Sequence, residues 1–152
     1  MTTHLLKTAS TVKSFIQGGN ATFTLVSLKT GTRFTYRVRE SEDGNCFFVG
    51  LLSGPNNEAD YAYLGIIRRG VFMRTPKSRI GETAPSYLAF KWAYGQLAKG
   101  ILPGQLECWH EGRCCRCGRT LTVPESIADG IGPECRKFAG AKAAPLLECI
   151  GA

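Results

Sequence analysis

Residues 23–38 read F-T-L-V-S-L-K-T-G-T-R-F-T-Y-R-V. An apolar side chain recurs at every second position on each side of Thr30-Gly31, as in strands that bury one face. A two-residue loop at Thr30-Gly31 would pair Leu25 with Tyr36 on the buried face. The stretch therefore predicts an antiparallel β-hairpin that starts a sheet.

The sequence after this hairpin predicts three further strands and one helix. Short apolar runs rich in β-forming residues follow at 46–52, 61–67 and 71–73, each next to turn residues. Residues 84–99 change to a helical period. The apolar stripe of this helix is Phe90, Ala93, Tyr94, Leu97 and Ile101. We therefore expect an α+β fold, in which an antiparallel β-meander is packed by one main helix.

A cysteine-rich segment follows the predicted helix. Cys114 and Cys117 stand in C-x-x-C spacing with a glycine directly after them, and Cys135 follows the Gly132-Pro133 turn. His110 precedes Cys114 by four positions and can supply an imidazole. The spacing predicts one structural zinc ion with four ligands, His110, Cys114, Cys117 and Cys135.

Three alternatives for these ligands remain open. Cys115 can replace Cys114, and Cys108 or Cys149 can replace His110. A short strand and a short helix are expected around the thiolates, as in treble-clef-like or zinc-ribbon-like modules. We predict a core domain at 1–102, a small zinc module at 103–140 and a C-terminal tail at 141–152.

The segment from Cys114 to Cys135 reads C-x-x-C-G-R-x-L-T-x-P-E-S-I-x-x-G-I-G-P-x-C. It resembles the signature of a family of small uncharacterised zinc-binding proteins, found mostly in bacteriophages, prophages and other mobile elements. Residues 23–38 and Lys77–Gly81 also resemble recurring parts of the phage members. The resemblance implies a zinc site and a phage or prophage origin, but no biochemical activity.

Composition narrows the class of protein. Neither a membrane-spanning run nor a signal-peptide pattern is present. Seven cysteines, four of them within 108–117, argue against a secreted disulfide framework. The expected location is a reducing cytoplasm, which for a phage protein is that of the bacterial host.

The chemistry of the sequence does not suggest an enzyme. Its two histidines are His4, near the N terminus, and His110, already assigned to the metal. The zinc-deaminase signature, a phosphate-binding loop and a dinucleotide fingerprint are all missing. We therefore predict a protein without catalytic residues and without a small-molecule substrate.

The charge distribution suggests what the protein binds. The chain carries 19 basic and 12 acidic residues, a net charge of +7, and residues 68–79 contain no acidic residue. We predict nucleic-acid binding, because a positive surface attracts phosphates. The alternative is a protein-binding inhibitor or adaptor that acts on a host complex, such as a defence nuclease with an acidic or nucleic-acid-binding surface. The predicted binding residues are Arg33, Arg37, Arg39, Arg68, Arg69, Arg74, Lys77 and Arg79.

Overall fold

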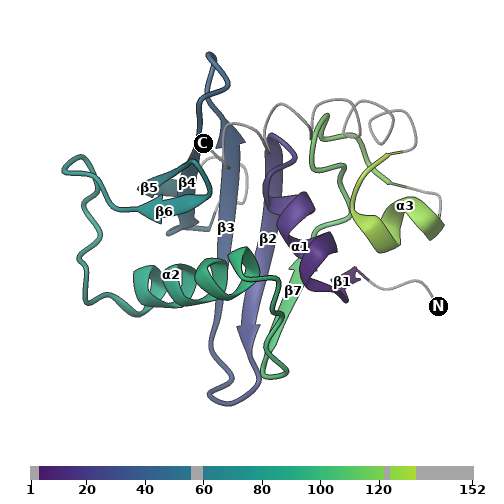
Figure 1. Ribbon diagram of the computed structural model, residues 1–152, viewed down its shortest axis with the longest axis horizontal. Coiled ribbons are helices and arrows are strands. Elements are labelled where there is room, and N and C mark those ends of the chain that lie inside the picture. The colour runs from purple at the N-terminus through teal and green to yellow at the C-terminus, as the bar shows by residue number, and fades with distance from the viewer. Residues whose placement is uncertain (1–3, 56–59, 122–123, 133–152) are drawn as a thin grey trace.

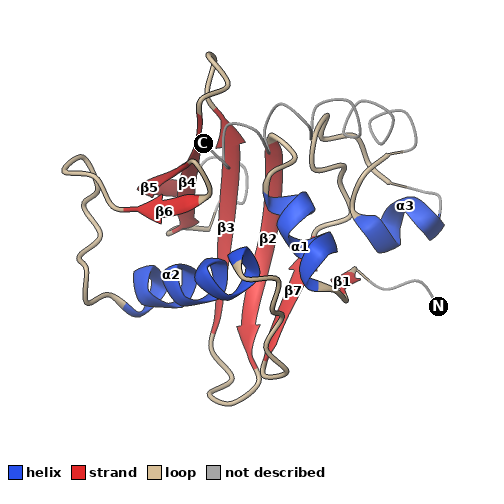
Figure 2. Cartoon of the chain, in the orientation of Figure 1, coloured by secondary structure: helices blue, strands red, loops and turns tan. Residues whose placement is uncertain are grey.

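One antiparallel sheet organises the chain. The computed structural model describes residues 4–55, 60–121 and 124–132, and within them seven strands pair in the order β1-β7-β2-β3-β4-β5-β6 (Figures 1 and 2). The strands are β1 (Leu5–Leu6), β2 (Asn20–Ser27), β3 (Arg33–Glu40), β4 (Cys46–Leu52), β5 (Tyr61–Arg68), β6 (Val71–Met73) and β7 (Leu106–His110). The helices are α1 (Ala9–Ile16), α2 (Pro85–Ala98) and α3 (Pro124–Asp129).

The predicted α+β class and β-meander are confirmed. Strands β2 to β6 are consecutive neighbours in the sheet, and each pair is antiparallel. Helix α2 lies across the sheet within the predicted range 84–99. Its Phe90 is fully buried, with its ring centroid 5.0 Å from that of Tyr36 and 4.6 Å from that of Phe72. The core therefore lies between α2 and the face of the sheet that carries Tyr36.

The pairing within the first hairpin differs from the predicted register by two residues. In the structure, Phe23 pairs with Tyr36 and Leu25 pairs with Phe34. The predicted two-residue loop would instead pair Leu25 with Tyr36. The turn is longer because the Ser27 N–H donates to the carbonyl of Thr32, which leaves four residues between them. A shift of two keeps every side chain on its predicted face, because side chains alternate with period two.

The predicted boundary between residues 102 and 103 lies just before a strand of the sheet. Strand β7 follows this boundary, yet it lies inside the sheet between β1 and β2. Leu106 and Cys108 are buried in the core, and Trp109 is partly exposed on the other face. This alternation is visible in the sequence L-E-C-W-H.

Among residues 4–55, 60–121 and 124–132, the two main helices cover one face of the sheet and leave the other without a helix. Helices α1 and α2 both lie in front of the sheet in Figure 1. Phe15 of α1 packs edge-on against Phe23 with centroids 6.2 Å apart, so this helix covers the same face as α2. Across the described ranges, no helix is long and apolar enough to cross a membrane.

Candidate functional site

The C-x-x-C segment forms a tight turn at the end of a short ladder. Arg113 and Thr120 pair antiparallel, and the N–H of Cys114 donates to the carbonyl of Arg119 at 2.9 Å. The N–H of Gly118 donates to the carbonyl of Cys114 at 3.0 Å, and its φ of 79° is one that residues with a Cβ avoid. The turn is thus compatible with two cysteine sulfurs that bind one metal ion.

Backbone N–H groups converge on the sulfur of Cys114. Those of Arg116 and Gly132 lie 3.4 and 3.3 Å from it. Burial raises the pKa of the Cys114 thiol, but hydrogen bonds from the N–H groups of Cys117, Gly132 and Arg116 and from the Cys117 thiol bring the pKa down to about 7. A substantial fraction of this sulfur is therefore thiolate at neutral pH, and thiolate is the form that binds metals.

Gly132, three positions before the predicted ligand Cys135, donates its N–H to the Cys114 sulfur. Cys135 itself lies outside the described residues.

His110 has a different environment from these thiols. It lies at the end of β7 and is 4% exposed. Its Nδ1 accepts the N–H of Gly112 at 3.0 Å, so the proton lies on Nε2, which donates to the carbonyl of Ile127. The His110 ring also stacks on that of His4, with centroids 4.8 Å apart. Both ring nitrogens are therefore engaged within the protein, and neither lone pair is available to a metal in this arrangement.

The pKa of His110 agrees with a neutral ring. Burial lowers this pKa, the carbonyl of Ile127 opposes the shift, and His4 adds to it. Within the described part of the chain, no three His, Cys, Asp or Glu side chains come together as a metal site. The structure therefore pairs Cys114 with Cys117 but does not bring His110 to them.

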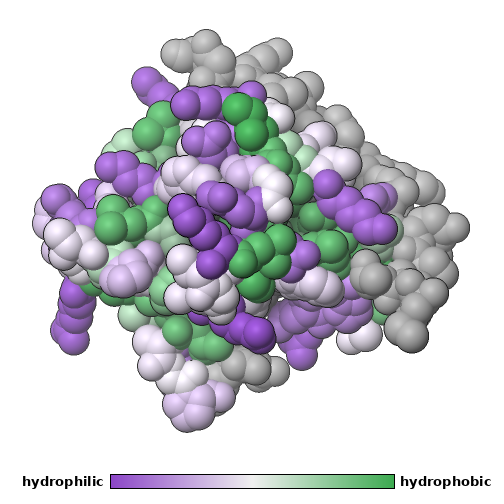
Figure 3. Space-filling view, turned by 90° about the horizontal axis from the view of Figure 1, so that it is seen from below, coloured by the Kyte–Doolittle hydropathy of each residue, from purple (hydrophilic) through white to green (hydrophobic). Residues whose placement is uncertain are grey.

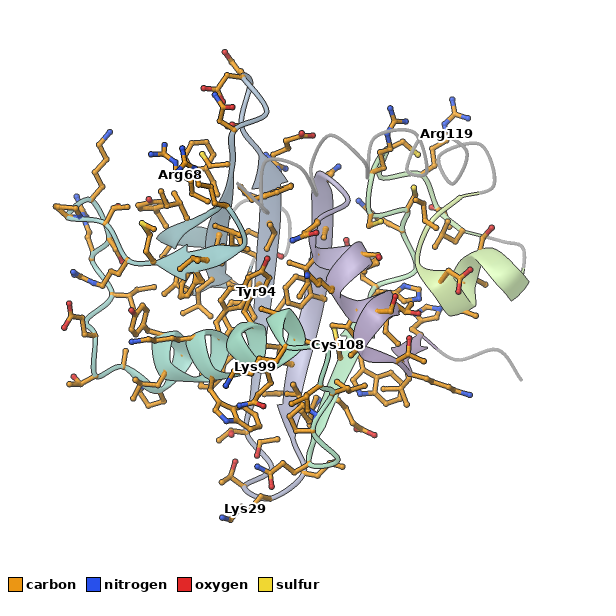
Figure 4. The ribbon with its side chains drawn as sticks, in the orientation of Figure 1. Lys29, Arg68, Tyr94, Lys99, Cys108 and Arg119 are labelled. Atoms are coloured by element: carbon orange, nitrogen blue, oxygen red, sulfur yellow. The ribbon has the colours of Figure 1, made fainter. Side chains whose placement is uncertain are left out.

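The three cysteines that are alternative metal ligands have different positions. Cys108 is fully buried in the core on β7, and burial raises the pKa of its thiol (Figure 4). Cys115 is 2% exposed and packs in the same core, where its backbone accepts the N–H of Asn20. Cys149 lies outside the described residues. Sequence reasoning missed that the backbone of Cys115 attaches the C-x-x-C turn of residues 114–118, which we name the knuckle, to β2.

The side of the sheet away from α1 and α2, which we name the open face, carries arginines. Arg33, Arg37 and Arg39 alternate with buried Tyr36 and Val38 along β3, as predicted. Arg33 and Arg39 are exposed. The guanidinium of Arg37 is half-buried and stacks 4.1 Å from the centroid of the Tyr61 ring.

Aromatic side chains lie on the same face. A bulge between β4 and β5 pairs Gly50 with Tyr63 and Phe48 with Ile66, which brings Tyr63 and Ile66 to the open face. The rings of Phe48 and Tyr63 meet edge to face with centroids 6.4 Å apart. Trp109 reaches this face from β7, opposite Thr24. Sequence reasoning did not assign Phe48 or Trp109 to the site, although both stand at outward positions of alternating strands.

The predicted binding residues within 68–79 differ in their surroundings. Arg68 is exposed near the end of β5, and Arg69 occupies the β5–β6 turn with a φ of 54° (Figure 4). Arg74 has a structural contact, since its Nε and Nη2 donate to the carbonyls of Ile80 and Ser78 at 2.7 and 2.9 Å. Lys77 and Arg79 are exposed in the connection from β6 to α2. Arg68 therefore lies on the open face, whereas Arg74 stabilises the loop that contains Ser78 and Ile80.

The sequence model of a family described as "Family of unknown function (DUF6011)" matches residues 109–138. This range contains the knuckle and Cys135. No curated protein and no solved structure matches the chain.

Proposed function

We propose that this chain is a small zinc-binding protein that binds nucleic acid through the open face of its sheet. The observation that carries the proposal is the arrangement on β3, where exposed Arg33 and Arg39 flank the Arg37–Tyr61 stack. Cations beside aromatic rings on a sheet are typical of surfaces that bind phosphates and bases together. The net charge of +7 supports the same function.

The zinc ion has a structural role in this proposal. The N–H groups around Cys114 and its contact with Cys117 fit a thiolate metal site. Cys114, Cys117 and Cys135 would hold the ion. Of the two cysteines that can replace His110, Cys108 is packed in the core. Cys149 is therefore the cysteine that we propose as the fourth ligand. The motif resemblance supports a phage or prophage protein that acts in the cytoplasm of its bacterial host.

Binding measured across a range of salt concentrations tests the function. The double variant Arg33→Ala/Arg39→Ala removes two exposed cations from β3. The matched control, Lys91→Ala/Lys99→Ala, removes two exposed cations from α2 and its C-terminal cap on the other side of the sheet. Fluorescence anisotropy with mixed-sequence DNA and RNA should show weaker binding for the arginine variant alone.

The salt dependence makes the result quantitative. Losing two phosphate contacts on a single strand should reduce the slope of log affinity against log salt by about 1.4. Both variants must first show the parent's zinc content and melting temperature. Equal loss of affinity in both variants would contradict the open-face site. Absence of binding by the parent at low salt would eliminate nucleic acid as the ligand.

A second candidate function is a protein-binding inhibitor or adaptor of a host complex. The observation that favours it is the outward side of α2, where Leu88 and Trp92 are 48% and 42% exposed. On the side of the molecule shown in Figure 3, apolar residues lie in separate patches between polar ones. A stoichiometric partner that survives nuclease treatment, and that is lost on Leu88→Ser/Trp92→Ser substitution, would favour this function over the first.

A further inference from the structure

We infer that the open face selects single-stranded nucleic acid, because two of its aromatic rings are placed to stack on unpaired bases. The inference rests on the proposed function and specifies its ligand. The two rings are those of Phe48 on β4 and Trp109 on β7, which are 47% and 36% exposed. Large apolar rings that stay in water beside cations suit a partner with flat aromatic surfaces and phosphates.

Both rings are held in place by neighbours on the same face. Phe48 contacts the ring of Tyr63, whose hydroxyl is hydrogen-bonded to that of Thr75 at 2.8 Å. The indole N–H of Trp109 donates to the carboxylate of Glu107 at 3.3 Å. Fixed rings lose little conformational freedom when a base stacks on them, so their contact area contributes to affinity with little entropic cost.

The surface between the two rings is polar and positive. Strands β2 and β3 separate β7 from β4, about 14 Å across the sheet. Phe48 lies level with Arg39 and Trp109 lies level with Thr35, four residues away along β3, so the two rings are about 19 Å apart. Hydroxyls of Thr24 and Thr35 meet there at 2.7 Å, next to the Arg37–Tyr61 stack and near Arg39. A phosphate backbone can therefore cross β3 between one base on Phe48 and another on Trp109.

The negative charge beside Trp109 favours one path of the nucleic-acid backbone over the open face. Glu107 repels phosphate at that edge, whereas β3 offers the cations Arg37 and Arg39. The phosphate backbone of the nucleic acid is thus directed over β3, with its bases turned toward the rings of Phe48 and Trp109. A duplex cannot use these rings in the same way, because its bases are paired and stacked on each other and expose only their edges in the grooves.

The test compares three ligands of equal length on the full chain: a mixed-sequence single strand, its duplex, and a single strand with abasic sites. We expect the single strand to bind at least tenfold tighter than the other two at equal salt. Phe48→Leu and Trp109→Leu should each lower its affinity roughly five- to hundredfold, since an aliphatic side chain cannot stack. Trp92→Leu on α2 is the matched control and should leave affinity unchanged.

Fluorescence provides a direct reading of the stacked ring. The chain has two tryptophans, so Trp109 is the sole tryptophan in a Trp92→Phe protein, and its emission can be excited selectively over that of the tyrosines. A single strand should quench its emission, and the abasic strand should quench it less. Equal affinity for all three ligands, with the Arg33→Ala/Arg39→Ala variant still weakened, would overturn stacking and leave nucleic-acid binding intact. Failure of every ligand to bind would overturn the proposed function and this inference together.

Discussion

His110 shows how far a residue's role can depend on its hydrogen bonds. Its position before two cysteines is that of a zinc ligand, yet its two nitrogens connect the Gly112 turn to the carbonyl of Ile127 in α3. Sequence spacing identifies residues that are close along the chain but not the direction of a ring. By contrast, the C-x-x-C spacing and its glycine were sufficient to predict that Cys114 and Cys117 meet, because both lie in one short turn.

Zinc retention distinguishes the roles of these residues. His110→Gln should keep the parent's zinc content while it lowers the free energy of unfolding by about 1–3 kcal/mol, because buried hydrogen-bond partners are lost. Cys117→Ser and Cys149→Ser should lose zinc, as measured by metal analysis of the purified proteins. Cys117 is exposed, so its variant and the parent should melt alike after chelation. Zinc loss in His110→Gln equal to that in Cys117→Ser would make His110 a ligand.

Gly18 permits the knuckle to pack on the core. A Cβ at this position would meet the sulfur of Cys115, and would lie 2.7 Å from its carbonyl oxygen. Gly18→Ala should therefore cost about 1–3 kcal/mol, since backbone atoms would have to move. Gly95→Ala is the control: its Cβ would meet nothing within 4 Å, and alanine in a helix should add about 0.5–1 kcal/mol. Urea unfolding measures both, and a neutral Gly18→Ala would show that the knuckle can shift at no cost.

At the scale of elements, helix α2 was predictable and β7 was not. Helix α2 has a full apolar stripe over four turns, and its buried residues Phe90, Ala93, Tyr94 and Leu97 follow it. Strand β7 has five residues, too few for its alternation to stand out beside four cysteines in 108–117. Its neighbours in the sheet also lie far away along the chain, and pairings of that kind leave no local pattern.

Packing of α2 can be tested with two leucines on opposite sides of the helix. Leu97 is 1% exposed, whereas Leu88 is 48% exposed. Leu97→Asp should cost more than about 4 kcal/mol and unfold most molecules, because it buries a carboxylate without a partner. Leu88→Asp should change stability by less than about 0.5 kcal/mol. Circular dichroism melting curves measure the stability of both variants. Native melting of Leu97→Asp would contradict the packing of α2 on the sheet.

For the whole molecule, the knuckle and the sheet form one connected structure. The N–H of Cys115 donates to the carbonyl of Gly130, and its carbonyl accepts the N–H of Asn20 at the start of β2. β7 leads into the knuckle from inside the sheet. Loss of metal should therefore loosen the sheet as well as the thiolate turn.

Calorimetry tests this coupling. Chelation of zinc should move a single melting transition to lower temperature, because the knuckle shares hydrogen bonds with β2 and with Gly130, directly after α3. Added zinc should restore the parent curve, and added magnesium should not. Two separate transitions, of which only the smaller responds to the chelator, would instead show that the segment after residue 102 unfolds independently.

The place of β7 in the sheet also affects how the protein is made on the ribosome. β1 has β7 as its neighbour in the described sheet, and the paired residues Leu5 and Trp109 are separated by most of the described chain. A nascent chain that has not yet released residues 106–110 presents β2 as an edge, with unpaired backbone groups and the apolar side chains of Phe23 and Leu25. During synthesis this edge is open to pairing with other chains, so the last strand of the sheet to be translated is also the one that protects the first hairpin from aggregation.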